Sequence, residues 1–134
     1  MKLNMISSLS MSVETCGAAE LFERTRNTGQ FVKRAYIIRS ELVSPRILDD
    51  VIAEHRNYLE ELAANGKLLA AGPFIPGGLE SKYNGAGMIV VYADSEDEAR
   101  RIGEDDPMHR KGVRKFTIDF WLVRHVSHSH KEIL

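Results

Sequence analysis

The stretch Ala86-Gly-Met-Ile-Val-Val-Tyr-Ala93, followed directly by Asp94-Ser-Glu-Asp-Glu98, decides the fold of this chain. Its first part is rich in β-branched residues and is apolar at both alternating sets of positions, which predicts a central strand with two apolar faces. Ser95 and Glu98 have the spacing of a capping box, which marks the start of a helix. We therefore expect a strand that passes directly into a helix ending near Ile102.

Further elements follow on both sides of this stretch. Residues 35–42 and 67–74 are short apolar runs that predict strands, and residues 113–124 predict a long final strand. Ser44-Pro45 predicts the start of a helix, because Ser caps free N–H groups and Pro suits the first helical position. That helix is expected to run to about Asn65 and to end at Gly66 in a left-handed cap. Its apolar stripe comprises Leu48, Val51, Ile52, Tyr58, Leu59 and Leu62.

The order strand–helix–strand–strand–helix–strand predicts a ferredoxin-like α+β sandwich, a four-stranded antiparallel sheet with two helices on one face. In the last strand, alternation directs one set of side chains toward the helices: Arg114, Phe116, Ile118, Phe120 and Leu122. The helix-free face keeps apolar groups such as Val90 and Tyr92, and a second chain would cover them. We therefore expect a homodimer in which sheet faces sheet.

Composition narrows the class of protein. The chain has 134 residues, 43% hydrophobic and 28% charged, with a formal charge of −1, so a basic surface for nucleic acid or an anionic membrane is not expected. One cysteine, Cys16, excludes an internal disulfide and a zinc site built from several cysteines.

Without an export signal or a run of about 20 apolar residues, we expect a cytoplasmic protein. We divide it into an extension (1–32) that is partly disordered, a folded domain (33–124) and a tail (125–134). Within the extension, residues 13–26 could form an amphipathic helix.

Two residues are candidates for proton transfer. His55 falls on the apolar stripe of the first helix, where it is either a core histidine bonded to backbone or an acid–base group. Asp106 precedes Pro107 and is either the N-cap of the following turn or a carboxylate that orients His55. The two roles of Asp106 are compatible, since one oxygen can cap while the other faces a cleft.

Other candidates are weaker. Asp119 and Thr117 lie on the helix-free face, where they line a pocket or pair with Lys115 or Arg39. Gly72-Pro73 could present backbone to a ligand, but no phosphate-binding glycine motif is present. His109 is expected to be exposed in its turn. In the tail, His125, His128 and His130 could hold a metal ion, but a disordered tail is the preferred interpretation.

These residues together resemble the YCII-related (YciI-like) proteins over residues 35–123. The matching pieces are His55-x-x-Tyr58-Leu59, Gly66-Lys-Leu-Leu-Ala-Ala-Gly72-Pro73, Ala93-Asp-Ser95 before an acidic helix with Ala99, Asp106-Pro107, Gly112 and Ile118-x-x-Trp121. Two positions depart from the family pattern: Phe120 precedes Trp121 where many members have Pro, and Met108 follows Pro107 where Phe or Tyr is usual.

The resemblance implies a dimeric α+β barrel with an active site made by His55 and Asp106, and some relatives look like lyases or isomerases acting on breakdown products of chlorinated aromatics. We accordingly expect an enzyme that uses this pair, without cofactor or metal, on a small organic acid, lactone or aromatic ring. Substrate contacts are expected from Tyr58, Gly72, Pro73, Asp119 and Trp121. The alternative is a non-catalytic module for small-molecule binding or oligomerisation.

Overall fold

The computed structural model describes residues 16–29, 32–46 and 48–127, and the chain divides into two compact units, residues 1–32 and 33–134. The first unit contains the helix α2 (Ala18–Asn27), whose surface carries ion pairs between Glu20 and Arg24 and between Glu23 and Arg26. The predicted amphipathic helix thus begins at Ala18 among the described residues, and positions 13–15 lie outside them. No described helix is long and apolar enough to cross a bilayer.

The second unit is built on a four-stranded sheet. Its strands are β1 (Lys33–Leu42), β2 (Leu68–Pro73), β3 (Ala86–Tyr92) and β4 (Arg114–Val123), and they lie in the order β2-β3-β1-β4. All neighbouring strands are antiparallel, and Ile38 of β1 lies opposite both Ile89 of β3 and Ile118 of β4. β1 and β3 are therefore the two central strands, and for β3 the apolar sequence predicts this position.

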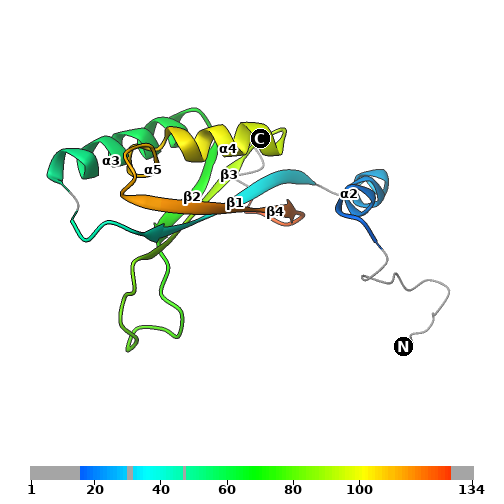
Figure 1. The fold of residues 1–134 in the computed structure, drawn as a ribbon. Helices are drawn as coiled ribbons and strands as arrows, with labels where there is room; N and C mark the ends of the chain where they lie inside the picture. Colours follow the sequence, from blue (N-terminus) through cyan, green and yellow to red (C-terminus); the bar gives the residue numbers. More distant parts are fainter. Residues whose placement is uncertain (1–15, 30–31, 47, 128–134) are drawn as a thin grey trace. The chain divides into compact units, whose positions relative to one another are not determined.

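Two main helices cover one face of this sheet, α3 (Asp49–Ala64) and α4 (Glu96–Asp105), as Figure 1 shows. A single turn, α5 (Pro107–Arg110), links α4 to β4. The predicted α+β sandwich with strand–helix–strand–strand–helix–strand order is confirmed. Gly66 follows α3 with φ of 73°, a left-handed conformation that glycine adopts at little cost, so this end of the helix is as predicted.

Two helix ends differ from the prediction. α3 begins at Asp49 and not at Pro45, because the Ser44 hydroxyl bonds to the backbone of Arg46 in a local turn and does not cap the helix. Acidic residues in the first turn favour the observed start. α4 starts as predicted, with the Ser95 hydroxyl accepting from the Glu98 N–H at 3.1 Å, but it continues past Ile102 to Asp105. It stops there because Asp106 precedes proline.

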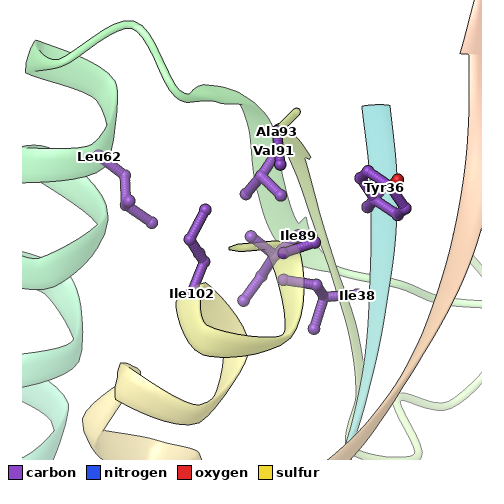
Figure 2. Packing of buried hydrophobic residues seen from close by; sticks show 8 residues of the cluster. Tyr36, Ile38, Leu62, Ile89, Val91, Ala93 and Ile102 are labelled. Atoms are coloured by element: carbon purple, nitrogen blue, oxygen red, sulfur yellow. The ribbon is translucent and has the colours of Figure 1, made fainter. Parts of the chain in front are cut away.

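The core lies between the helices and the sheet. Leu62 from α3 and Ile102 from α4 point toward Ile38, Ile89 and Val91 on the central strands (Figure 2). All five side chains are buried, and each contributes about 1.5–3 kcal/mol relative to an exposed position. This packing fixes both helices against one face of the sheet, and so fixes the residues that they carry.

The helix-free face is apolar in part. Alternation places Ala35, Val90, Tyr92 and Val123 on it, and these four side chains are buried. Trp121 shares the face and is 43% exposed. Phe120 lies on the helix side as expected, where it contacts the Tyr36 ring with centroids 5.4 Å apart, and it is 39% exposed. The apolar surface that this face exposes is therefore smaller than the sequence pattern predicts.

Candidate functional site

His55 and Asp106 meet at the junction of α3 and α5. Asp106 is 1% exposed, and its two carboxylate oxygens lie 2.8 and 2.9 Å from His55 Nδ1. Asp106 is also the N-cap of α5, where Oδ1 accepts the Met108 N–H at 2.9 Å. Val51, Met108 and Val113 form a small apolar cluster beside the pair. One buried carboxylate therefore both starts a helix and holds the imidazole.

The contact fixes which ring nitrogen of His55 carries a proton. An ionised carboxylate only accepts hydrogen bonds, so Nδ1 must donate to Asp106. Nε2 then holds the free lone pair of the neutral ring, and no described residue bonds to it. Because His55 lines a cavity and its side chain is 25% exposed, Nε2 is the atom available for proton exchange.

That cavity lies between α3 and the helix-facing side of the sheet. It has a volume of about 170 Å³ and is open on one side. Most of its wall is apolar, and four of the lining residues carry polar side-chain groups: Ser40, His55, Tyr83 and Arg114. The remaining lining residues are Leu59, Ala71, Gly72, Pro73, Gly87, Met88, Ile89 and Met108. A small, largely apolar molecule with few polar groups suits such a wall.

A second polar cluster borders the cavity, and we did not predict it. His109 is partly buried, so its expected exposure is wrong: Nδ1 lies 2.7 Å from the Gly103 carbonyl and Nε2 lies 2.8 Å from the Ser40 hydroxyl. The Phe116 ring packs against the imidazole with centroids 4.6 Å apart. Arg114 Nε donates to the same Ser40 hydroxyl at 2.8 Å. The helix-side alternation of β4 already placed Arg114 near this position, but it carried no information about its partners.

Burial lowers the pKa of His109, and the Arg114 charge lowers it further, against opposing effects of the Gly103 carbonyl and Asp106. The ring is therefore neutral near pH 7. Since a carbonyl only accepts, Nδ1 carries the proton and donates to Gly103. Nε2 consequently accepts from the Ser40 hydroxyl, which leaves the Ser40 oxygen to accept from Arg114.

The five expected substrate contacts fall into two groups. Gly72 and Pro73 line the cavity that also contains His55. The Tyr58 hydroxyl instead donates to the Ile102 carbonyl at 2.7 Å, and burial together with nearby Asp105 and Asp106 raises its pKa to about 12. Its phenol is a neutral link between α3 and α4 and is not part of the cavity wall.

Asp119 and Trp121 lie on the helix-free face. Asp119 pairs with Arg39 across β1 and β4 at 2.8 Å, one of the alternatives that its position in the sequence left open. The structure therefore brings together His55, Asp106, Gly72 and Pro73, and leaves Tyr58, Asp119 and Trp121 outside this cavity. Within the described ranges, no group of three or more His, Cys, Asp or Glu side chains is arranged to hold a metal ion. His128 and His130 lie outside the described residues.

This chain is similar in sequence to known proteins. The model of the YCII-related domain family matches residues 31–121. The uncharacterised protein YjpA of Bacillus subtilis (strain 168) is 36% identical over 73 residues, which cover 54% of this chain and 78% of YjpA. Among solved structures, 5-chloro-2-hydroxyhydroquinone dehydrochlorinase (TftG) of Burkholderia phenoliruptrix, in complex with 2,5-dihydroxybenzoquinone, is similar at 25% identity with a TM-score of 0.45, covering 71% of this chain and 97% of that one. The extent of the family match shows that this chain belongs to the YCII-related domain family.

Proposed function

We propose that this protein is an enzyme of the lyase or isomerase type that moves protons on a small organic acid, lactone or aromatic ring through His55. The observation that carries the proposal is the His55–Asp106 pair: one imidazole nitrogen is held by a buried carboxylate and the other lies free at a cavity. A buried histidine used only for packing usually has both nitrogens bonded within the fold, whereas His55 Nε2 has no partner among the described residues.

The arrangement suits general acid–base chemistry. His55 Nε2 takes a proton from the substrate, and the Asp106 carboxylate stabilises the imidazolium that forms. In an elimination, the electron pair of the broken C–H bond expels a leaving group. In an isomerisation, the same imidazolium returns the proton to a different carbon. Both reactions need only proton transfer and a site that admits the substrate, which the cavity provides.

The test is turnover by the intact protein of small lactones, hydroxylated and chlorinated aromatics and unsaturated acids in D₂O, followed by ¹H NMR for exchange, elimination or rearrangement. For a substrate that is turned over, His55→Gln should lower the rate by roughly 100- to 10,000-fold, the usual contribution of a general acid–base group. The matched control is His125→Gln, which changes an exposed histidine beyond β4 and should leave the rate unchanged. Equal rates for wild-type protein and His55→Gln would overturn the proposal.

The alternative, a binding module without turnover, makes a different prediction in the same experiment. A ligand would perturb the NMR signals of cavity residues, yet no compound would exchange deuterium or rearrange. The free Nε2 of His55 favours the enzyme, because ligand binding by itself does not require a histidine whose tautomer is fixed by a buried acid.

We also propose that the protein is a homodimer joined through the helix-free face. Trp121 on this face and Phe74 after the edge strand are each more than one third exposed. A second hollow of about 260 Å³ lies on the β2 side, lined by Ala70, Ala71, Gly72, Pro73, Phe74, Met88 and Val90. Phe74 lines this hollow, and Trp121 lies on β4 at the other edge of the sheet. Exposed aromatic side chains and an apolar hollow are typical of an interface between protein chains.

A further inference from the structure

The guanidinium of Arg114, the first residue of β4, lines the cavity. Its Nε donates to the Ser40 hydroxyl at 2.8 Å, and its Nη2 donates to the Ser40 carbonyl at 3.2 Å and also to the Gly85 carbonyl. All three acceptors are uncharged, and no ion pair in the described part of the chain includes Arg114. The cavity therefore contains a fixed positive charge that no carboxylate of these residues neutralises, with Nη1 left for a ligand.

The sheet leaves room for this guanidinium. Gly87 on β3 lies beside it, and a Cβ at Gly87 would come within 3.2 Å of Arg114 Nη2. That distance is tighter than ordinary packing allows, while the backbone of Gly87 does not have the positive φ that would itself demand glycine. A side chain at this position would therefore press against the guanidinium and displace it by a few tenths of an ångström.

A directional chain of hydrogen bonds holds the guanidinium in place. It begins at the Gly103 carbonyl, which accepts from His109 Nδ1, and continues through His109 Nε2, which accepts from the Ser40 hydroxyl. Ser40 has donated its only proton, so its oxygen can only accept, and Arg114 Nε supplies the donor. Residues from α4, α5, β1 and β4 therefore fix one charged group at the cavity, a positioning that packing of the core does not require.

We propose that Arg114 binds the anionic oxygen of a small organic acid, and that this contact defines the substrate class of the cavity. The acid group would lie at Nη1, with the apolar body against Leu59, Ile89 and Met108. A volume of about 170 Å³, below the ~300–1,000 Å³ of pockets for drug-sized ligands, limits the body to about a single ring. This inference rests on the proposed function, because it names the substrate class of the same site.

The experiment compares acids with their uncharged amides as ligands of the full chain. The probes are benzoate and benzamide, 4-hydroxybenzoate and 4-hydroxybenzamide, and 2-furoate and 2-furamide, titrated at pH 8 and followed by NMR shifts of cavity residues. Wild-type protein should bind at least one acid roughly tenfold or more tightly than its amide, the usual effect of a hydrogen bond to a charged group. Arg114→Gln should abolish this preference and leave the amide affinity within about twofold. No preference in wild-type protein, or a preference that persists in Arg114→Gln, overturns the proposal.

Arg114 also bonds to two backbone carbonyls, so Arg114→Gln could fail to fold. A measurement on wild-type protein covers that case: the acid that binds most tightly should shift the ¹⁵N side-chain resonance of Arg114, and its amide should not. Absence of a shift with all three acids would count against the proposal. Ser40→Ala keeps the charge but removes its hydroxyl partner, so the preference for the acid should fall by less than in Arg114→Gln.

His55→Gln separates this inference from the proposed function. It removes the proton-transfer group and leaves Arg114 and its partners in place, so the preference for the acid should remain. Turnover that survives in His55→Gln would refute the proposed function alone. A preference for the acid that disappears in His55→Gln and persists in Arg114→Gln would assign the anion to His55 and refute the inference about Arg114 alone.

Discussion

At the scale of single residues, Asp106 performs two tasks with one carboxylate. It caps α5 through the Met108 N–H and accepts from His55 Nδ1. Asp106→Ala removes both bonds and should lower the free energy of unfolding by about 2–4 kcal/mol, the combined cost of a lost cap and a donor without its acceptor. Asp106→Asn keeps an oxygen for the cap and should cost clearly less. Urea denaturation at pH 7.5 measures both values.

The neighbouring exposed acid provides the control for this comparison. Asp105→Ala removes a carboxylate one residue earlier that caps no helix, and its stability should stay close to that of the wild-type protein. Equal losses for Asp106→Asn and Asp106→Ala would show that the cap contributes nothing measurable.

His109 makes stability depend on pH. Burial lowers its pKa below the ordinary value of 6.5, so the unfolded chain takes up a proton before the folded one does. The contribution of neutral His109 to the free energy of unfolding is complete above about pH 6.5. It is lost as the pH falls through the pKa of His109 in the folded protein. Urea denaturation at pH 7.5, 6.5 and 5.5 should therefore show a decline in wild-type protein. His109→Gln cannot take up this proton and should decline less, whereas parallel declines in the two proteins would contradict the assignment.

At the scale of secondary-structure elements, α4 packs closely against β4 at Gly103, a residue without a side chain. A Cβ at Gly103 would come within 2.7 Å of the Phe116 ring, which also contacts His109. Gly103→Ala should destabilise the fold by about 1–3 kcal/mol through overpacking, partly offset by the ~1 kcal/mol that Ala gains in a helix. Thermal unfolding measures the change. In a Phe116→Leu background the same substitution should cost less, and an equal cost in both backgrounds would exclude the ring as its cause.

Local sequence determines most of these elements, and tertiary packing determines the rest. Alternation in β3, the cap at Ser95 and the left-handed Gly66 are local, so the order of elements along the chain and one end of each main helix could be predicted. The start of α3 could not, because Ser44 and Pro45 suit a turn as well as a helix start. His55 and Asp106 were predicted as candidates from an apolar stripe and an Asp-Pro step, helped by the family resemblance. Their contact crosses 51 residues and needed the structure.

The second polar cluster, formed by Ser40, His109 and Arg114, could not be predicted from the sequence. Ser40 is 74 residues from Arg114 and 69 from His109, so no local pattern connects them. Alternation places Ser40 and Arg114 on the helix side of the sheet, but alternation alone does not distinguish a site from a satisfied buried polar group. His109 follows a proline turn, where histidines are commonly exposed, and only the packing of α5 against Gly103 buries it.

At the scale of the whole molecule, the proposed dimer predicts a defined mass in solution. Sedimentation equilibrium of the full chain should give twice the 15.1 kDa monomer mass. Trp121→Glu places a charge on the helix-free face and should shift the equilibrium toward monomers, because burying an unpaired charge in an apolar interface is costly. Arg56→Glu, an exposed position on α3, should stay dimeric. A wild-type protein that sediments as a monomer would refute the dimer.

The two layers of the domain contribute different groups to the one cavity. His55 and Asp106 belong to the helical layer, whereas Ser40, Gly87 and Arg114 belong to the sheet. The scaffold is thus modular: recognition could diverge by exchange of strand residues while the proton-transfer pair stays unchanged. For protein engineering, a library restricted to positions 71, 73 and 114 would sample new ligands on a constant reaction centre.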